Sequence, residues 1–419
     1  MNTLNLYLMN ISHAGNTSGV DRYIDTLING LKNYPYIHVV WIHLLKDDAV
    51  LFPTEDKMAN YIKMTLPVPQ QYDMVIGEPF WMRKYNEQVY RLIKHLFHDK
   101  VNNIIHLHTL NLIDLAVYIR EQTSCKIITH LHCIPWKSLY NHDKKRFNKL
   151  YDLVYRNKDE ECTPEIFAIN NCEQQAYSAP DALVCVTHCG MNFVKTCVQK
   201  ATDTMVVIPN GMNDFSGSYI QRTAKTEQET FRCLYVGVLS ESKGIFYILD
   251  ALNKVRQKGY HVSLTIAGTY TSVFRDKIQQ NYPDVETILL GRIPFEELKK
   301  YYQESDVGII ASLQEQASYV AVEMSMYGLP VVTTAVDGLD ETFTDEVNAL
   351  KVNTKFSPVL GLSVDVEMMA TQIIRLITDS ELRNRLGRNV RKLYETELSL
   401  DLMMNRTIQV YEKLKNDIK

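Results

Sequence analysis

Two glutamates in the second half of the chain have a spacing that could serve carbohydrate chemistry. Glu315 follows a short apolar stretch, and Glu323 comes eight residues later, inside a predicted helix that begins near Tyr319. A carboxylate can accept two charge-assisted hydrogen bonds, which suits it to hold neighbouring hydroxyl groups. The start of the helix would offer backbone N–H groups to phosphate oxygens. The spacing alone is equally consistent with a solvated glutamate and a helix-surface glutamate.

Two more side chains could act on a phosphate and on a hydroxyl. Lys243 precedes Gly244 in a turn after an apolar strand candidate, and a fixed cation stabilises negative charge that develops on a leaving group. A surface lysine at a helix entrance would show the same local sequence. His132 follows another strand candidate, and imidazole can donate or accept a hydrogen bond near neutral pH. A purely structural histidine is the other interpretation.

A turn after the first predicted strand contains Gly15 and Gly19. Glycine in such a turn lets the backbone approach a phosphate or a sugar closely. The sequence GNTSGVD lacks the G-x-G-x-x-G spacing, which argues against a dinucleotide-binding dehydrogenase.

Short apolar strands that alternate with helices must position these residues. In the first half, residues Val20 to Leu31 have apolar side chains at helical spacing. Near-continuous apolar strands between helices indicate a parallel sheet covered on both faces. The strand candidates of the first half are Leu4 to Met9, Val39 to Leu45, Ile104 to Leu107, Lys126 to Leu131, Ala182 to Val186 and Val206 to Ile208.

The alternation restarts after a polar segment, Asn213 to Phe231, which is the predicted linker. The strands of the second half are Arg232 to Val236, Val262 to Ala267, Thr287 to Leu290, Val307 to Ala311 and Val331 to Thr333, with helices from Gly244, Tyr270, Phe295 and Tyr319. The sequence therefore predicts two doubly wound α/β domains. Open parallel sheets bind ligands beyond their strand ends, so we expect the site at strand-to-helix turns of both facing domains.

Bulk composition excludes several classes of protein. A chain of 419 residues with a net charge of −4 is long enough for two domains and has no overall basic surface for nucleic acid. No apolar run approaches the roughly 18 residues of a membrane helix. The eight cysteines form no C-x-x-C pair. Cys185, His188 and Cys189 could suggest a metal site, but we interpret the thiols as structural and predict a reduced, cytoplasmic protein.

Several segments together resemble the retaining GT-B glycosyltransferases of the large bacterial family with an E-x7-E motif. Glu315 and Glu323 match that motif. The other matching segments, in the order of the family, are Gly15 to Val20, Thr129 to His132, Ile208 to Gly211, Tyr235 to Gly244, Leu290 to Gly291 and Gly338 to Glu341. The resemblance covers nearly the whole chain and implies the GT-B fold, two facing Rossmann-like domains with a C-terminal helix that crosses back to the first. We expect residues 1–212 plus about 396–419 in the acceptor-side domain and residues 213–395 in the nucleotide-sugar domain.

The resemblance also implies roles for individual residues. Lys243, Glu315 and His132 are the expected catalytic residues: the cation at the leaving phosphate, the carboxylate on the transferred sugar and the imidazole on a sugar hydroxyl. The expected donor-binding residues are Glu323 at the ribose, Gly15, Gly19, Gly237, Ser318, Tyr319 and Val320. One residue departs from the family pattern, because Val238 stands where an arginine is usual. Arg292 is a candidate to replace that charge.

The implied activity is transfer of a sugar from a nucleoside diphosphate sugar, with uridine diphosphate the commonest nucleotide, with retention of configuration. No metal and no cofactor are expected beyond the nucleotide sugar as co-substrate. A non-catalytic nucleotide-sugar-binding partner subunit and a sugar-nucleotide epimerase are the alternatives. The acceptor stays open among a sugar, a lipid-linked sugar, a peptide and a small molecule.

A basic and aromatic stretch, residues 136–158, could touch the inner face of an anionic membrane. A domain helix with a solvated basic face is the plainer interpretation.

Overall fold

The computed structural model describes residues 3–13, 19–69, 79–97, 102–156, 171–197, 201–217, 222, 229–357 and 359–416. Its contacts divide the chain into two compact units. Unit 1 comprises Met1–Ile134, Asn157–Gly211 and Leu400–Lys419, and unit 2 comprises Pro135–Arg156 and Met212–Ser399. No helix among the described residues is long and apolar enough to cross a membrane.

Unit 1 is built around a sheet whose strand order is β3-β4-β2-β1-β5-β6-β7-β8. All neighbours pair in parallel except the β3–β4 hairpin. The central strand β1 has side chains buried on both faces, which explains its continuous apolar sequence. The strands are β1 Leu4–His13, β2 Ile37–Lys46, β3 Thr54–Lys57, β4 Tyr61–Pro67, β5 Asn103–Leu107, β6 Cys125–Leu131, β7 Ala182–Cys185 and β8 Met205–Val207.

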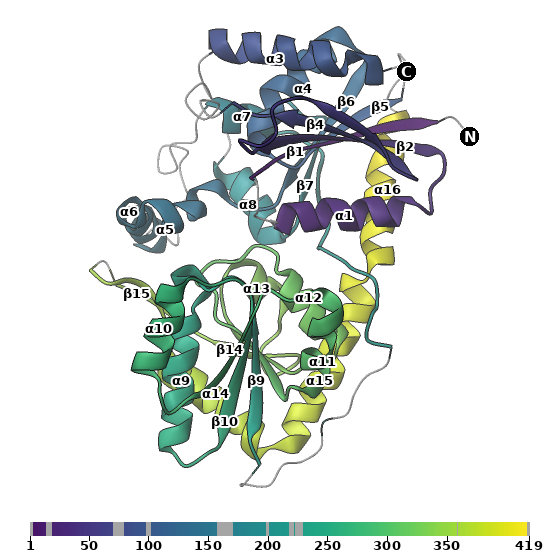
Figure 1. Ribbon diagram of the computed structural model, residues 1–419. Coiled ribbons are helices and arrows are strands. Elements are labelled where there is room, and N and C mark those ends of the chain that lie inside the picture. The colour runs from purple at the N-terminus through teal and green to yellow at the C-terminus, as the bar shows by residue number, and fades with distance from the viewer. Residues whose placement is uncertain are drawn as a thin grey trace. The chain divides into compact units, whose positions relative to one another are not determined.

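Helices cover both faces of this sheet. Helices α3 and α4 lie on one face, and α1 and α16 lie on the other (Figure 1). The helices of unit 1 are α1 Gly19–Leu31, α3 Pro79–Ile93, α4 Ile113–Gln122, α7 Asn171–Ser178, α8 His188–Cys197 and α16 Leu400–Asn416. The predicted return of a late helix to the first domain is confirmed by α16, which packs on α1 and on β5.

Unit 2 has a fully parallel six-stranded sheet with the order β11-β10-β9-β12-β13-β14. Helices α9, α10 and α14 lie on one face and α11, α12 and α15 on the other (Figure 1). The strands are β9 Phe231–Val236, β10 Val262–Ala267, β11 Glu286–Gly291, β12 Val307–Ile310, β13 Val331–Thr334 and β14 Leu350–Val352. The helices are α9 Ile245–Gln257, α10 Ser272–Asn281, α11 Phe295–Glu304, α12 Tyr319–Met326, α13 Asp337–Thr342, α14 Val366–Thr378 and α15 Ser380–Leu393. Both sheets confirm the predicted doubly wound α/β architecture.

Residues 135–156 group with unit 2, whereas we expected them within the first domain. They form a 3₁₀ turn, Pro135–Ser138, and the helices α5 Leu139–His142 and α6 Lys144–Arg156. The apolar side of α6 is buried at Phe147 and Leu150. Tyr151 contacts Phe356 of a small antiparallel hairpin, β15 Thr354–Ser357 and β16 Gly361–Val364, with ring centroids 4.8 Å apart. This packing explains the grouping.

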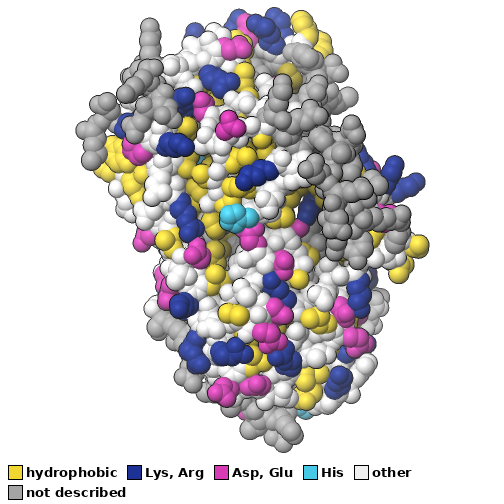
Figure 2. Space-filling view, turned by 180° about the vertical axis from the view of Figure 1, so that it is seen from behind, with side chains coloured by type: hydrophobic (Ala, Val, Ile, Leu, Met, Phe, Trp, Pro, Cys, Tyr) yellow, Lys and Arg dark blue, Asp and Glu magenta, His cyan; other side chains and the backbone are white. Residues whose placement is uncertain are grey.

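Charged side chains of both signs lie on one face of the described part of the molecule. On the face that Figure 2 shows, the described Lys and Arg side chains are interspersed with Asp and Glu rather than gathered into a field of one sign. The absence of nucleic-acid binding stays a prediction from the net charge.

Gly244 holds the β9–α9 turn against the end of β12. Its φ is +73°, and a Cβ at this position would lie 2.0 Å from the carbonyl oxygen of Ala311. We therefore expect Gly244→Ala to destabilise the protein by about 2–4 kcal/mol, because left-handed strain and overpacking add. Urea unfolding of the full chain measures this loss.

Gly259 provides the matched control for this substitution. Its φ is +93°, but a Cβ there would meet no atom within 4 Å. Gly259→Ala should lower the free energy of unfolding by only about 1–2 kcal/mol, which is the cost of the left-handed backbone conformation alone. Equal losses in the two variants would show that the contact with Ala311 does not constrain the turn.

Candidate functional site

The ends of β9 and β12 in unit 2 bring Lys243 and Glu315 together. Lys243 ends a 3₁₀ turn, Glu241–Lys243, and the backbone N–H of Leu313 donates to the carbonyl oxygen of Ser242 at 2.8 Å. That bond ties the two strand-end turns to each other. Lys243 Nζ then forms an ion pair with Glu315 Oε2. The lysine side chain is 38% exposed, so its charge remains accessible to a ligand of unit 2.

A second ion pair adjoins the first. Lys137, in the 3₁₀ turn before α5, pairs through Nζ with Asp337 Oδ1 at the start of α13. The other carboxylate oxygen of Asp337 accepts a hydrogen bond from the backbone N–H of Glu315 at 3.4 Å. Asp337 has a φ of +42° although it is not glycine, and such backbone conformations concentrate at functional sites. The two lysines and two carboxylates thus form one linked group.

The start of α12 lies in the same set of turns. Ser318 caps the helix, because its Oγ accepts a hydrogen bond from the backbone N–H of Ala321 at 3.2 Å. The backbone N–H groups of Tyr319 and Val320 belong to the first helical turn, where no intrahelical acceptor is available. The helix dipole adds a partial positive charge at this end. The expected diphosphate contacts, Ser318 to Val320, therefore lie at a helix start suited to an anion.

Glu323 is buried inside unit 2. Its side chain is 1% exposed and its Oε2 accepts a hydrogen bond from the hydroxyl of Tyr302. The ring of Tyr302 stacks on Tyr327 at 5.1 Å between centroids. Burial and the Glu323 charge raise the pKa of Tyr327 to about 12. Sequence spacing placed Glu323 on the α12 helix, but it did not indicate this tyrosine contact.

The turn after β9 contains the departure from the family pattern. Gly237 has a φ of +142°, and the carbonyl oxygen of Val238 accepts a hydrogen bond from Tyr235 Oη at 2.9 Å. The side chain of Val238 is 54% exposed, so it contributes an apolar surface at the position where the resemblance predicts an arginine. Arg292 is exposed after β11. The structure instead joins Lys137 to the Lys243–Glu315 pair through Asp337.

His132 lies in unit 1, directly after β6, and is half-buried. Its Nε2 is 3.0 Å from Nδ1 of His108, and the ring of Tyr23 in α1 packs edge-on at 5.0 Å between centroids. Burial lowers the pKa of His132 to about 3, so the ring is neutral and one nitrogen is engaged by His108. Such a ring is a fixed donor or acceptor rather than a cation.

Of the two glycines predicted to lie near the donor, the structure describes one, Gly19. Gly19 begins α1, and a Cβ at this position would meet no atom within 4 Å of the described residues. Among the described residues, none fills the space beside Gly19. Gly15 lies outside the described residues.

The cysteine pair noted in the sequence does not form a site in the described residues. Cys185 is buried in β7, and burial raises the pKa of its thiol to about 12. The interpretation of these cysteines as structural stays a prediction.

Unit 2 can therefore bind an anion and stabilise charge at one point. Lys243 and Lys137 supply positive charge, Glu315 supplies a hydroxyl acceptor, and the α12 start supplies amides. Lys137 and Asp337 escaped the sequence analysis because 200 positions separate them. In the sequence, the one feature that could have indicated a role for Asp337 is its position next to Gly338, after the last predicted strand.

Comparisons with known proteins give a family match for part of unit 2. Residues 220–393 match the sequence model of the family "Glycosyl transferases group 1". An uncharacterized glycosyltransferase of Methanocaldococcus jannaschii is 29% identical over 221 residues, which are 50% of this chain and 54% of that protein. The chain spans about half the length of the curated relatives it matches.

Solved structures resemble the whole chain. Sucrose-phosphate synthase from Thermosynechococcus elongatus has a TM-score of 0.73 at 18% identity and covers 98% of this chain and 99% of its own. Anabaena HepE, solved in complex with UDP and glucose, has a TM-score of 0.63 at 14% identity and covers 98% of this chain and 100% of its own. At these identities the likeness establishes the fold: two Rossmann-like domains of the GT-B type.

Proposed function

We propose, from the premise that residues 220–393 match the group 1 glycosyl transferases, that this chain transfers a sugar from a nucleoside diphosphate sugar to an acceptor. The observation that carries the proposal is the Lys243–Glu315 pair, which adjoins the capped start of α12. A helix start suits the phosphates of a sugar diphosphate, a lysine adds positive charge for them, and a carboxylate suits the sugar hydroxyls.

The residues of unit 2 have separate tasks in this proposal. Lys243 releases Glu315 when donor binds, and its ammonium then stabilises the charge that develops on the departing phosphate. Glu315, freed from the ion pair, accepts hydrogen bonds from the transferred sugar. Glu323 binds the ribose hydroxyls. The amides of Ser318, Tyr319 and Val320 hold the diphosphate.

Lys137 compensates for Val238 in the same proposal. The family arginine at that position would have supplied a second positive charge, and the linked group of ion pairs contains Lys137 instead. Asp337 neutralises Lys137 until an anionic ligand competes for it. The site therefore needs no charge from Arg292.

In unit 1, His132 is proposed to contact a sugar hydroxyl of the donor, and Gly15 and Gly19 are proposed to let the donor approach the backbone. The neutral ring of His132 suits a hydroxyl better than a phosphate. We further propose transfer with retention of configuration, as the family resemblance implies.

Uridine diphosphate is the proposed donor nucleotide. Its support is the fold-level likeness to Anabaena HepE, which was solved with UDP and glucose, and to an E. coli trehalose-6-phosphate protein bound with UDP-2-fluoro glucose. The alternative function is a non-catalytic nucleotide-sugar-binding subunit. Val238 is the observation that favours it, since a missing cation at the leaving group would reduce catalysis more than binding.

A thermal-shift screen of the full chain against nucleotide sugars tests the donor assignment. A ligand at about 100 times its Kd stabilises the folded state by about 2.7 kcal/mol, so a UDP-sugar should raise the melting temperature by several degrees. Assaying the hits for donor hydrolysis and transfer separates the two functions. Binding with turnover supports the transferase, and binding without turnover for any acceptor supports the subunit.

Screen results can also refute the proposal. If no nucleoside diphosphate or nucleotide sugar stabilises the chain, the Lys243–Glu315 pair is a structural ion pair and neither function applies. A guanosine diphosphate sugar that stabilises more than its uridine counterpart would overturn only the choice of nucleotide.

Location in the cytoplasm with peripheral contact to the inner membrane face is also a proposal. Phe147 and Leu150 of α6 are buried within unit 2, so they are not available to insert into a membrane. Residues 136–158 would therefore attract an anionic membrane mainly by charge. A groove of about 440 Å³ is lined by three lysines, Lys144, Lys145 and Lys149, and by one acidic residue, Asp152. Such contact should weaken as salt concentration rises.

A further inference from the structure

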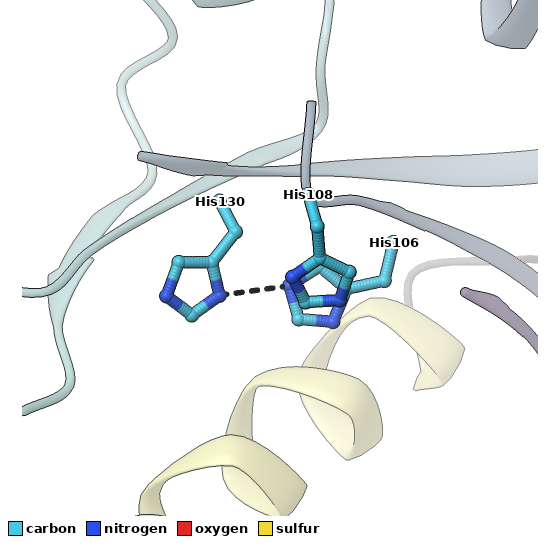
Figure 3. A group of neighbouring side chains, drawn as sticks. All are labelled: His106, His108 and His130. Carbon is cyan, nitrogen blue, oxygen red and sulfur yellow. Dashed lines mark hydrogen bonds between the residues drawn. The ribbon is translucent and has the colours of Figure 1, made fainter. Parts of the chain in front are cut away.

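Three buried histidines in unit 1 gather at the ends of two neighbouring strands. His106 lies near the end of β5, His108 follows that strand, and His130 lies near the end of β6. In the parallel register, His106 is opposite Ile128, and side chains two residues apart in a strand share a face. The three imidazoles therefore project from the same face of the sheet, as Figure 3 shows.

The ring nitrogens lie close enough to share an ion. One nitrogen from each of the three rings lies within 4.8 Å of the others. Nε2 of His106 is 3.2 Å from Nδ1 of His130. Two histidine nitrogens on one tetrahedral zinc ion stand roughly 3.3 Å apart, given Zn–N bonds of about 2.0–2.1 Å. The nitrogen of the third ring lies within 4.8 Å of the other two, so a shift of about 1.5 Å or less would bring it to this spacing.

Neighbouring side chains orient two of the rings by hydrogen bonds, as is usual for histidines that bind a metal ion. Nδ1 of His106 is 2.8 Å from the hydroxyl of Tyr411 in α16, and Nδ1 of His108 is 3.0 Å from Nε2 of His132. Outer hydrogen bonds of this kind orient metal-binding imidazoles. Tyr23 of α1 closes the group, with its ring 4.6 Å from that of His130 between centroids.

The hydrogen bonds among these rings do not satisfy all their nitrogens. Nε2 of His108 and Nε2 of His130 are buried and have no hydrogen-bond partner among the described residues. The two side chains are 4% and 1% exposed. A buried polar atom without a partner lowers stability, so the cluster is incomplete as a hydrogen-bonded core. Coordination of an ion would give Nε2 of His108 a partner.

We propose that His106, His108 and His130 bind one first-row divalent transition metal ion, with zinc as the ion of choice. Neutral imidazole donors suit Zn²⁺, Cu²⁺ and Ni²⁺, whereas Mg²⁺ and Ca²⁺ prefer oxygen ligands. The ion has a structural role, because the ligands are buried and α16 reaches them through Tyr411. This proposal does not depend on the proposed transfer activity, which we expect to require no metal.

Metal binding by the full chain tests the proposal. The protein is stripped with a chelator and dialysed against Zn²⁺, and the bound metal is counted by mass spectrometry. We expect one ion per chain in the wild type, and at least tenfold weaker binding in His108→Gln and in His130→Gln. His43→Gln is the matched control, since His43 is also buried in unit 1 but bonds to Ser12 outside the cluster.

A Co²⁺-substituted wild-type protein gives a readout that needs no variant. Intense visible d–d absorption without a thiolate charge-transfer band is expected for a four-coordinate site of three imidazole nitrogens and one water molecule. A thiolate band would assign the metal to cysteines and overturn the proposal. Absence of stoichiometric zinc in the wild type, or wild-type affinity in a His108→Gln/His130→Gln double variant whose circular dichroism is native, would show that the cluster is a hydrogen-bonded core.

Discussion

Lys243→Met should lower kcat for sugar transfer by about 10²–10³-fold, while the KM for the donor changes little. Removal of a single preorganised group that stabilises developing negative charge typically has an effect of this size. Methionine keeps most of the volume of the lysine stem and removes only its charge. Steady-state kinetics with the donor found in the stability screen measure both parameters. Lys243→Arg should restore part of the loss, because the charge returns.

Two controls separate catalysis from general electrostatics. Lys254 forms a surface ion pair with Glu367 in the same unit, and Lys254→Met should leave kcat within about twofold because exposed pairs contribute little. Lys137→Met should reduce kcat by a smaller factor than Lys243→Met and should raise the donor KM. Unchanged kcat in the Lys243 variant, or an equal loss in the Lys254 variant, would remove Lys243 from the reaction.

Glu323→Gln should weaken binding of the nucleoside diphosphate by about tenfold or more. Hydrogen bonds to a charged group contribute about 1.5–3 kcal/mol, and 1.4 kcal/mol corresponds to a factor of ten in Kd. Glutamine keeps the shape of the side chain and one acceptor toward the hydroxyl of Tyr302. Titration calorimetry with the free nucleotide measures the loss without any need for an acceptor.

The tyrosine contact complicates the glutamate experiment, so Tyr302→Phe is the matched control. It removes the hydrogen bond to Glu323 but keeps the carboxylate, and it should change nucleotide affinity less than Glu323→Gln does. Glu315→Ala gives the contrasting result, a lower transfer rate with nearly unchanged nucleotide affinity. Nucleotide binding that is equal in wild type and Glu323→Gln would assign Glu323 to packing alone.

The parallel core could be predicted because burial dictates its sequence. Strands such as β1 and β10 are buried on both faces and read as apolar runs, so the predicted Leu4 to Met9 and Val262 to Ala267 fall within the observed strands. The hairpin strand β3 was not predicted, since its sequence TEDK is fully exposed and no apolar alternation indicates it. Strand pairing at a sheet edge depends on the neighbour rather than on the strand's own side chains.

The site could be predicted only in part, for a different reason. Glu315 and Lys243 follow predicted strands, and turns after parallel strands meet at one edge of a sheet, so their proximity follows from the fold. Lys137 follows no strand of unit 2. It joins the group because residues 135–156 pack on that unit. This tertiary packing cannot be inferred from the local sequence. The Tyr302 contact with Glu323 likewise depends on how α11 packs against α12.

The three-segment construction of unit 1 bears on how the protein is made. Helix α16 packs on α1 so closely that a Cβ at Gly30 would overlap the side chain of Met404, yet all of Met212–Ser399 is translated before α16. At roughly 5–20 residues per second, translation of Met212–Ser399 takes about 10–40 seconds. The face formed by α1 and β5 lacks α16 during that time. During that interval the nascent chain exposes an apolar surface, and His106 lacks Tyr411. A chaperone that shields nascent chains would therefore be needed most between the synthesis of β8 and that of α16.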